Sequence, residues 1–167
     1  MIRTAQASLR LATVWDPPLW MWESQSPSPG PGATGSSMSD YMENELLDHV
    51  LSAATFTAAA TLHYGLFITP ANDDASGTQV SGGSYARQAA TNNATNFPAA
   101  SGGAKANGAA VNFGTASANW GSVGYVALFD ASSGGNMYFW GPMVPSIPIL
   151  NGDSLNFPIG NITFSFD

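Results

Sequence analysis

Short segments with apolar residues at every second position constrain the fold of this chain more than any other feature. Leu62, Tyr64, Leu66 and Ile68 alternate with other residues, and segment 123–129 repeats the pattern. A period of two places alternate side chains on one face of a β-strand. Further candidate strands lie at 84–91, 109–113, 136–140, 147–150, 154–157 and 162–166. We therefore expect about eight short strands.

Turn-forming residues separate these segments. Clusters of Gly, Ser, Asn and Asp occur at 72–74, 81–83, 101–103, 132–135 and 151–153. Strands separated by such turns are typical of antiparallel sheets. The pattern predicts an all-β fold with the architecture of an antiparallel β-sandwich, jelly-roll-like in its connections.

One segment ahead of the strands has helical periodicity. Residues 40–52 predict a single N-terminal helix, with Asp40 as its cap and Glu43 completing a capping box. We expect this helix to lie against one end or face of the sandwich. The apolar residues at helical spacing are Met42, Leu46, Leu47, Val50 and Leu51.

The chain divides at a tract rich in Pro, Gly and Ser. Residues 24–37 contain no apolar side chain larger than Ala, which is typical of a linker. Residues 1–23 lack the continuous apolar core of a secretory signal. We expect residues 1–37 to be a non-globular N-terminal extension and residues 38–167 to form the helix and β-sandwich domain.

The extension contains a cluster of three tryptophans, and two interpretations of it stay open. Trp15, Trp20 and Trp22 could belong to an anchoring arm that docks on a neighbouring subunit. Alternatively, residues 1–37 are an upstream extension and Met38 opens the gene product. We favour the second interpretation because a well-formed domain starts directly at Met38.

Charge and composition exclude several classes of protein. The chain has 11 Asp and Glu against 4 Lys and Arg, a formal net charge of -7, whereas nucleic-acid binding needs a basic surface. No apolar run is long enough to cross a membrane. Because Cys is absent, disulfides, thiolate metal sites and cysteine nucleophiles are excluded. We expect neither a nucleic-acid nor a membrane partner.

No pattern in the sequence predicts catalysis. His49 and His63 are the only histidines, too few for a zinc site. Ser84 follows two glycines but precedes a predicted strand, whereas a nucleophile elbow requires a helix there. The acidic residues outside the helix lie at predicted turns or at the chain end. We expect no catalytic residues, no metal and no cofactor, and therefore no enzyme.

Two groups of residues are candidates for an assembly interface. The first is the apolar side of the helix, and the second is the aromatic strand near 138–140. Arg87 and Lys105 are the only Lys or Arg residues in segment 38–167. We expect Arg87 to form a surface ion pair or to contact an acidic neighbouring subunit. The interface candidates are Leu46, Leu47, Val50, Arg87, Tyr138 and Trp140.

Aromatic side chains also suggest a sugar-binding surface. Alternation along a strand places Tyr138 and Trp140 on one face and Phe139 on the other. Exposed aromatic faces can stack on sugar rings. The candidate glycan-binding residues are therefore Trp120, Tyr138 and Trp140.

Several segments, in their order along the chain, carry a resemblance to a known family. The chain resembles small tailed-bacteriophage virion proteins that are usually labelled tail fibre proteins, and similar small folds serve as head decoration or cement proteins. The resemblance covers residues 38–167 and brings no catalytic residues with it. The segments that carry it are 41–49, 62–67, 80–88, Trp120-Gly121, 127–130 and 151–153.

The resemblance implies a non-enzymatic structural protein of the phage virion, in the tail fibre or tail tip, assembled in the bacterial host cytoplasm. Its expected partners are other virion proteins and further copies of itself, in a homo-oligomer for which a trimer is favoured. Two alternatives stay open. One is a capsid decoration (head cement) protein, and the other is a carbohydrate-binding module that recognises glycan on the host surface.

Overall fold

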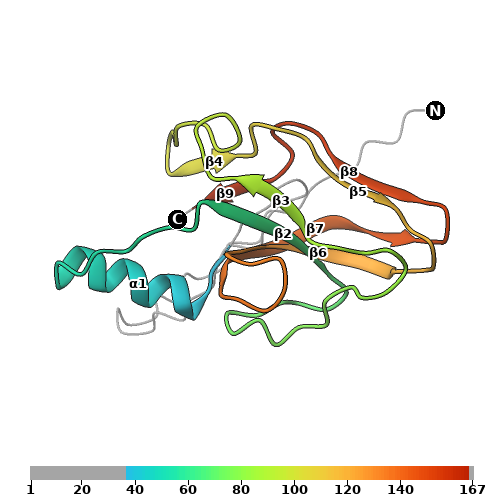
Figure 1. Ribbon diagram of the computed structural model, residues 1–167, viewed down its shortest axis with the longest axis horizontal. Coiled ribbons are helices and arrows are strands. Elements are labelled where there is room, and N and C mark those ends of the chain that lie inside the picture. Colours follow the sequence, from blue (N-terminus) through green and yellow to red (C-terminus); the bar gives the residue numbers. More distant parts are fainter. Residues whose placement is uncertain (1–36, 166–167) are drawn as a thin grey trace, which may run out of the picture.

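A computed structural model describes residues 37–165, which form a β-rich body with one projecting helix (Figure 1). Our expectations for the extension, the linker up to residue 36 and the tryptophan cluster fall outside the described residues. The elements are β1 (Ser37–Met38), α1 (Asp40–Leu51), β2 (Thr61–Phe67), β3 (Gln88–Thr91), β4 (Ala104–Ala106), β5 (Val111–Thr115), β6 (Gly121–Phe129), β7 (Met137–Ile149), β8 (Ser154–Phe157) and β9 (Thr163–Ser165).

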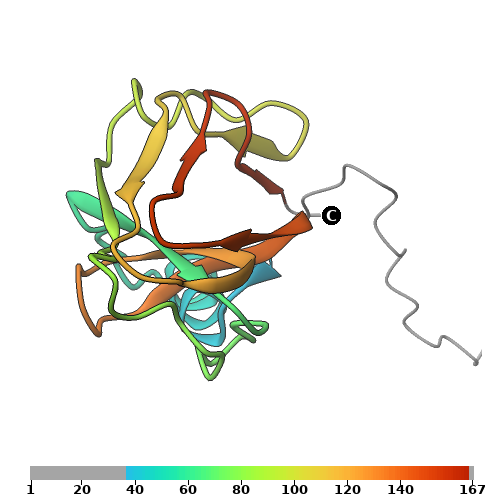
Figure 2. The ribbon, with the colours of Figure 1, turned by 90° about the vertical axis from the view of Figure 1, so that its right-hand side faces the viewer.

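The described strands form one larger sheet and two small ones. The five-stranded sheet has the order β1-β7-β6-β2-β3, and the pairs β4-β9 and β5-β8 form the two-stranded sheets. Every described strand pair is antiparallel. Figure 2 shows the two small sheets arching over one face of the larger sheet. The predictions of a mostly β fold, antiparallel pairing and a single N-terminal helix are confirmed.

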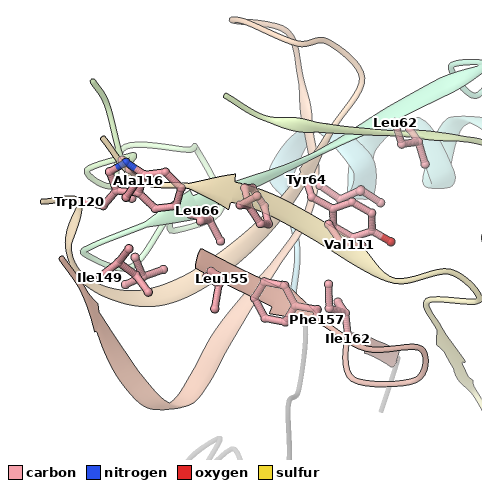
Figure 3. Packing of buried hydrophobic residues seen from close by; sticks show 14 of the residues in the cluster. Leu62, Tyr64, Leu66, Val111, Ala116, Trp120, Ile149, Leu155, Phe157 and Ile162 are labelled. Carbon is pink, nitrogen blue, oxygen red and sulfur yellow. The ribbon is translucent and has the colours of Figure 1, made fainter. Parts of the chain in front are cut away.

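The hydrophobic core lies between the larger sheet and the two small ones. Tyr64 and Leu66 of β2 lie beside residues of β5 and β8, including Val111 and Leu155, while Leu62 belongs to the same cluster farther along the strand (Figure 3). The alternate residue Phe67 belongs to a smaller cluster with Phe129, Ala127, Met137 and Ala71. The period-two pattern of the sequence therefore separates two clusters on opposite faces of one strand.

Strand β7 differs from the prediction because it unites two expected strands. Segments 136–140 and 147–150 are the ends of one 13-residue strand that contains Pro142, Pro145 and Pro148. Proline lacks the backbone N–H that a central strand needs for hydrogen bonds on both sides, but it is tolerated at a sheet edge. On its outer side β7 pairs only with β1, at Phe139 and Trp140, so within residues 37–165 the proline-containing part forms an edge.

Other strands also differ from the sequence prediction in their bounds or in their existence. The strand expected at 84–91 shortens to β3, because Ser84 adopts a positive φ of 62° in the turn before it. Strand β4 was not anticipated, since its sequence Ala-Lys-Ala has no apolar alternation.

Helix α1 starts one residue earlier than expected. Ser39 is its N-cap, and the Ser39 hydroxyl accepts a hydrogen bond from the Met42 N–H at 3.2 Å. Asp40 is therefore the first helical residue, and Glu43 lies one position too far along for a capping box. The Ser39 hydroxyl also donates to the Met137 carbonyl, which ties the start of the helix to β7.

Candidate assembly surface

Helix α1 extends away from the β-sheet body, and none of its residues is buried. Exposure rises along its apolar side, from 37% at Leu46 to 55% at Leu47, 67% at Val50 and 78% at Leu51. Figure 1 shows why, since the helix leaves the body at its N-terminal end and projects outward. We call Leu46, Leu47, Val50 and Leu51 the α1 stripe. The expectation that the helix lies against the body holds only for its first turn.

The first turn of α1 is firmly attached to the body. Tyr41 stacks on Tyr138 of β7, with ring centroids 6.0 Å apart, and Met42 packs against the main core. The N–H of Asp40 donates to the carbonyl of Asp73 at 3.2 Å. The base of the helix is thus fixed in place while its far end projects.

The segment that returns from α1 to β2 leaves the α1 stripe uncovered. The helix closes with the Ser52 N–H donating to the Asp48 carbonyl, and Ala53 has a positive φ of 57°. Of residues 52–60, only Phe56 and Ala59 are partly buried. Phe56 lies edge-on to Tyr138, at the base of the helix rather than along the stripe.

An apolar groove lies between the base of α1 and the β4-β9 sheet. Its volume is about 380 Å³, and Lys105 is its one charged lining residue among those described. We call it the α1 groove. Its larger side chains include Met42, Leu46, Phe56, Phe97, Phe139 and Phe164.

Charge is distributed unequally between the helix and the groove. The helix carries the carboxylates of Asp40, Glu43, Glu45 and Asp48. Burial, followed by the negative charge of Glu45, raises the pKa of Tyr41 above its ordinary value. Within residues 37–165 Lys105 forms no ion pair with any carboxylate.

Arg87 is half-buried and makes its described contacts within its own subunit. Its guanidinium carbon lies 3.4 Å from the centroid of the Phe129 ring, a cation–π contact. Nη1 donates to the carbonyls of Ala131 and Gly134 at 2.9 and 2.8 Å, and Nη2 donates to Gln79 Oε1 at 2.9 Å. The expected surface ion pair is wrong, because backbone carbonyls and an aromatic ring take the place of a carboxylate.

Burial lowers the pKa of Arg87, and the nearby Tyr85 and Asp130 oppose that change. The neighbouring Gly65 provides room for this arrangement. A Cβ at residue 65 would lie 3.2 Å from the Phe129 ring and 3.5 Å from Arg87 Nε. Arg87 therefore acts as an internal clamp between the 131–134 turn and the sheet.

The aromatic residues 138–140 do not form the single platform expected from alternation. The register between β6 and β7 shifts, so that Phe129 pairs with Met137 while Leu128 pairs with Phe139. This bulge at Tyr138 leaves Tyr138 and Phe139 on the main core and Trp140 on the second cluster. Tyr138 and Trp140 therefore lie on different faces.

The three glycan-binding candidates also differ in exposure. Trp120 is 3% exposed, with its Nε1 donating to the Gly83 carbonyl at 2.9 Å and its ring edge-on to Tyr85. Tyr138 is also buried. Trp140 is partly exposed, and its Nε1 donates to Asp73 Oδ1 at 2.9 Å.

The structure brings together part of the set of predicted site residues. Leu46, Leu47 and Val50 share one side of α1, with Tyr138 beneath the helix base. Arg87 and Trp140 lie elsewhere. Sequence reasoning missed the α1 groove, although the scarcity of cations had already singled out Lys105.

Within the described part of the chain, no three His, Asp or Glu side chains lie close enough together to hold a metal ion. None of the helices described between residues 37 and 165 has the length and hydropathy needed to span a bilayer.

A β-rich domain with an apolar helix side that the rest of residues 37–165 leaves uncovered has the features of a structural subunit that functions in an assembly. Residues 37–165 match the model of a phage fibre family, described as podophage GP4 fiber I protein gp80, and the chain belongs to this family. No curated protein matches it.

Membership of this family confirms the main functional predictions. The protein is a structural component of the phage tail fibre and is located in the virion. As a fibre protein it associates with other virion proteins. The family also supports the fibre interpretation over the capsid decoration alternative.

Proposed function

We propose that the chain is a self-associating fibre subunit that forms a homo-oligomer, with a trimer favoured, through α1. The observation that carries this proposal is the α1 stripe, in which exposure rises from Leu46 to Leu51 with no buried residue anywhere in the helix. A surface helix normally turns its apolar side toward the core of its own domain. Contiguous apolar surface of this kind marks interaction sites in soluble proteins.

Physical considerations favour this surface for assembly. Apolar surface removed from water contributes about 25 cal/mol per Å². The Tyr41–Tyr138 stack and the Ser39 cap already fix the base of the helix, so that binding has less conformational entropy to remove. Closed rings are the common outcome for identical subunits, which is compatible with a trimer.

The proposal includes the finer architecture. The larger sheet and the two small sheets act as the two layers of an antiparallel, jelly-roll-like sandwich, and residues 38–167 form the assembling unit. The shared core, with side chains from β2, β5 and β8, supports the layered arrangement. Assembly does not require the extension that precedes the domain, although Ser37, at its expected end, already belongs to β1.

The test is the molar mass of the purified chain by size-exclusion chromatography with light scattering. We expect an oligomer from the wild type and from a chain that begins at Met38. The control double variant Leu150→Gln/Ile159→Gln, which changes two exposed apolar residues outside the helix, should also form an oligomer. The double variant Leu47→Gln/Leu51→Gln should be monomeric. A monomeric wild type at high concentration contradicts the proposal.

Glycan binding is a second candidate function, and one observation favours it. Trp140 borders a pocket of about 220 Å³ that Asn156, Asn161 and Thr163 also line. Amide and hydroxyl groups beside an aromatic ring suit a sugar. We expect Trp140→Ala to lose binding on a glycan array. Tyr125→Ala removes the ring that neighbours Trp140 and is the control, which should keep binding. An absence of glycan binding by the wild type contradicts this candidate.

A further inference from the structure

We propose that the α1 groove of one subunit receives the α1 stripe of a second copy of the chain. This inference rests on the proposed function and adds to it the acceptor surface. Each subunit then contributes two different surfaces, its helix and its groove, to two different neighbours.

The groove and the stripe are continuous on the surface of the molecule. Leu46 belongs to both, since it lines the groove and begins the stripe. Leu47, Val50 and Leu51 do not line the groove of their own subunit. Helix α1, which carries them, projects away from the body (Figure 1). A groove of about 380 Å³ has room for several apolar side chains of a neighbour.

Charge identifies α1 of a second copy as the occupant. Lys105 lies in the groove without a carboxylate partner in residues 37–165, and Arg87 is committed to internal contacts. Glu43 lies four residues before Leu47, on the same side of the helix, and is exposed. A neighbour's α1 in the groove therefore brings the exposed Glu43 carboxylate toward the Lys105 ammonium group.

The same charges disfavour direct pairing of two α1 helices about a two-fold axis. Each helix carries four carboxylates, so a symmetric helix pair would bring like charges together. Helix-into-groove contact is instead head-to-tail, and head-to-tail contacts close into rings when the rotation permits. This geometry agrees with a cyclic trimer.

A bulky side chain introduced at an exposed position of the groove would block it without removing a core contact. Ala100 is exposed and lines the groove, whereas the adjacent Ala99 is exposed and lies outside it. In the full chain, Ala100→Trp should raise the Kd of assembly at least about tenfold, as expected when an interface loses its complementarity. Ala99→Trp is the matched control and should leave the Kd unchanged. Analytical ultracentrifugation measures both, and urea unfolding verifies that both variants fold.

A charge-exchange test addresses Lys105 directly. Lys105→Glu alone and Glu43→Lys alone should each weaken assembly at least about tenfold, because like charges then meet in the interface. The combined variant should recover most of the wild-type affinity. Lys105→Glu with Asp74→Lys restores the same net charge at an exposed loop and should not recover it. The effect should shrink in high salt.

The outcomes separate this inference from the proposed function. If Leu47→Gln/Leu51→Gln dissociates the oligomer while Ala100→Trp and Lys105→Glu do not, the helix is an interface but the groove is not its acceptor. If the wild type is monomeric, both proposals are wrong. Recovery of affinity by the Lys105→Glu/Glu43→Lys combination supports the helix-into-groove contact.

Discussion

The β-sheet body and helix α1 place similar apolar side chains in opposite environments. In the body, Leu62, Tyr64 and Leu66 face a second layer of strands and are almost fully buried. In α1, Leu47, Val50 and Leu51 follow an equally regular pattern but face no part of their own described chain. Periodicity thus determines which side of an element is apolar, while the presence of an opposing layer determines whether that side is buried. For α1 the described residues supply no opposing layer, and the proposed assembly would provide one from a second copy.

The largest effect should come from removing a ring from the body. Trp120→Ala deletes a buried ring and the hydrogen bond from Nε1 to Gly83. We expect a loss of about 3–5 kcal/mol in the free energy of unfolding. Urea denaturation measures it. A loss below about 1 kcal/mol would show that the body is packed no more tightly than the helix.

The next effect should come from a buried polar side chain. Asn107 is 2% exposed; its Nδ2 donates to the carbonyls of Ala109 and Pro158, and its Oδ1 accepts from the Ile162 N–H. Asn107→Ala leaves these backbone groups without a partner and should lower the unfolding free energy by about 2 kcal/mol or more. Asn44→Ala, at an exposed position of α1, is the control and should be neutral or slightly stabilising. Equal losses of unfolding free energy in the two variants would contradict the difference between the body and the helix.

Alkaline pH should weaken the body through its buried tyrosines. Burial raises the pKa of Tyr64 well above its ordinary value near 10. Above about pH 10 the unfolded chain therefore loses a proton that the folded chain retains, and stability falls by up to about 1.4 kcal/mol per pH unit. Below that pH the stability is fully present. Tyr64→Phe should reduce the slope of unfolding free energy against pH between 10 and 11. An unchanged slope would contradict the attribution of the alkaline loss of stability to Tyr64.

The smallest effect on folding should come from α1. Leu51→Gln replaces an exposed side chain by one of similar helix propensity, so the unfolding free energy of the dilute monomer should change by less than about 0.5 kcal/mol. Thermal unfolding at low concentration measures this. A larger loss would mean that the far end of α1 already packs within its own subunit.

Local patterns predicted the parts of the fold that local forces determine. The segment 154–157 coincides with β8, and the helix was placed to within one residue at each end. Long-range features escaped prediction. The bulge that separates Tyr138 from Trp140 depends on pairing with β6, and the continuity of β7 through its prolines depends on its edge position.

The candidate site was predicted in the same partial way. Helical spacing identified Leu46, Leu47 and Val50, since that signal is local. The burial of Trp120 and the internal contacts of Arg87 depend on residues distant in the sequence. The groove around Lys105 forms only when α1 and the β4-β9 sheet come together, so no single segment encodes it.

The prolines at the outer edge of β7 have a consequence for behaviour at high copy number. Exposed strand edges let identical proteins join backbone to backbone into fibrils without a fixed end point. Pro142, Pro145 and Pro148 have no N–H to offer an incoming strand, so this edge makes a poor template. During infection, when many newly made copies crowd together, the edge thereby resists runaway polymerisation. The proposed contact between copies uses side-chain surfaces instead, and such a contact can stop at a finite number of copies.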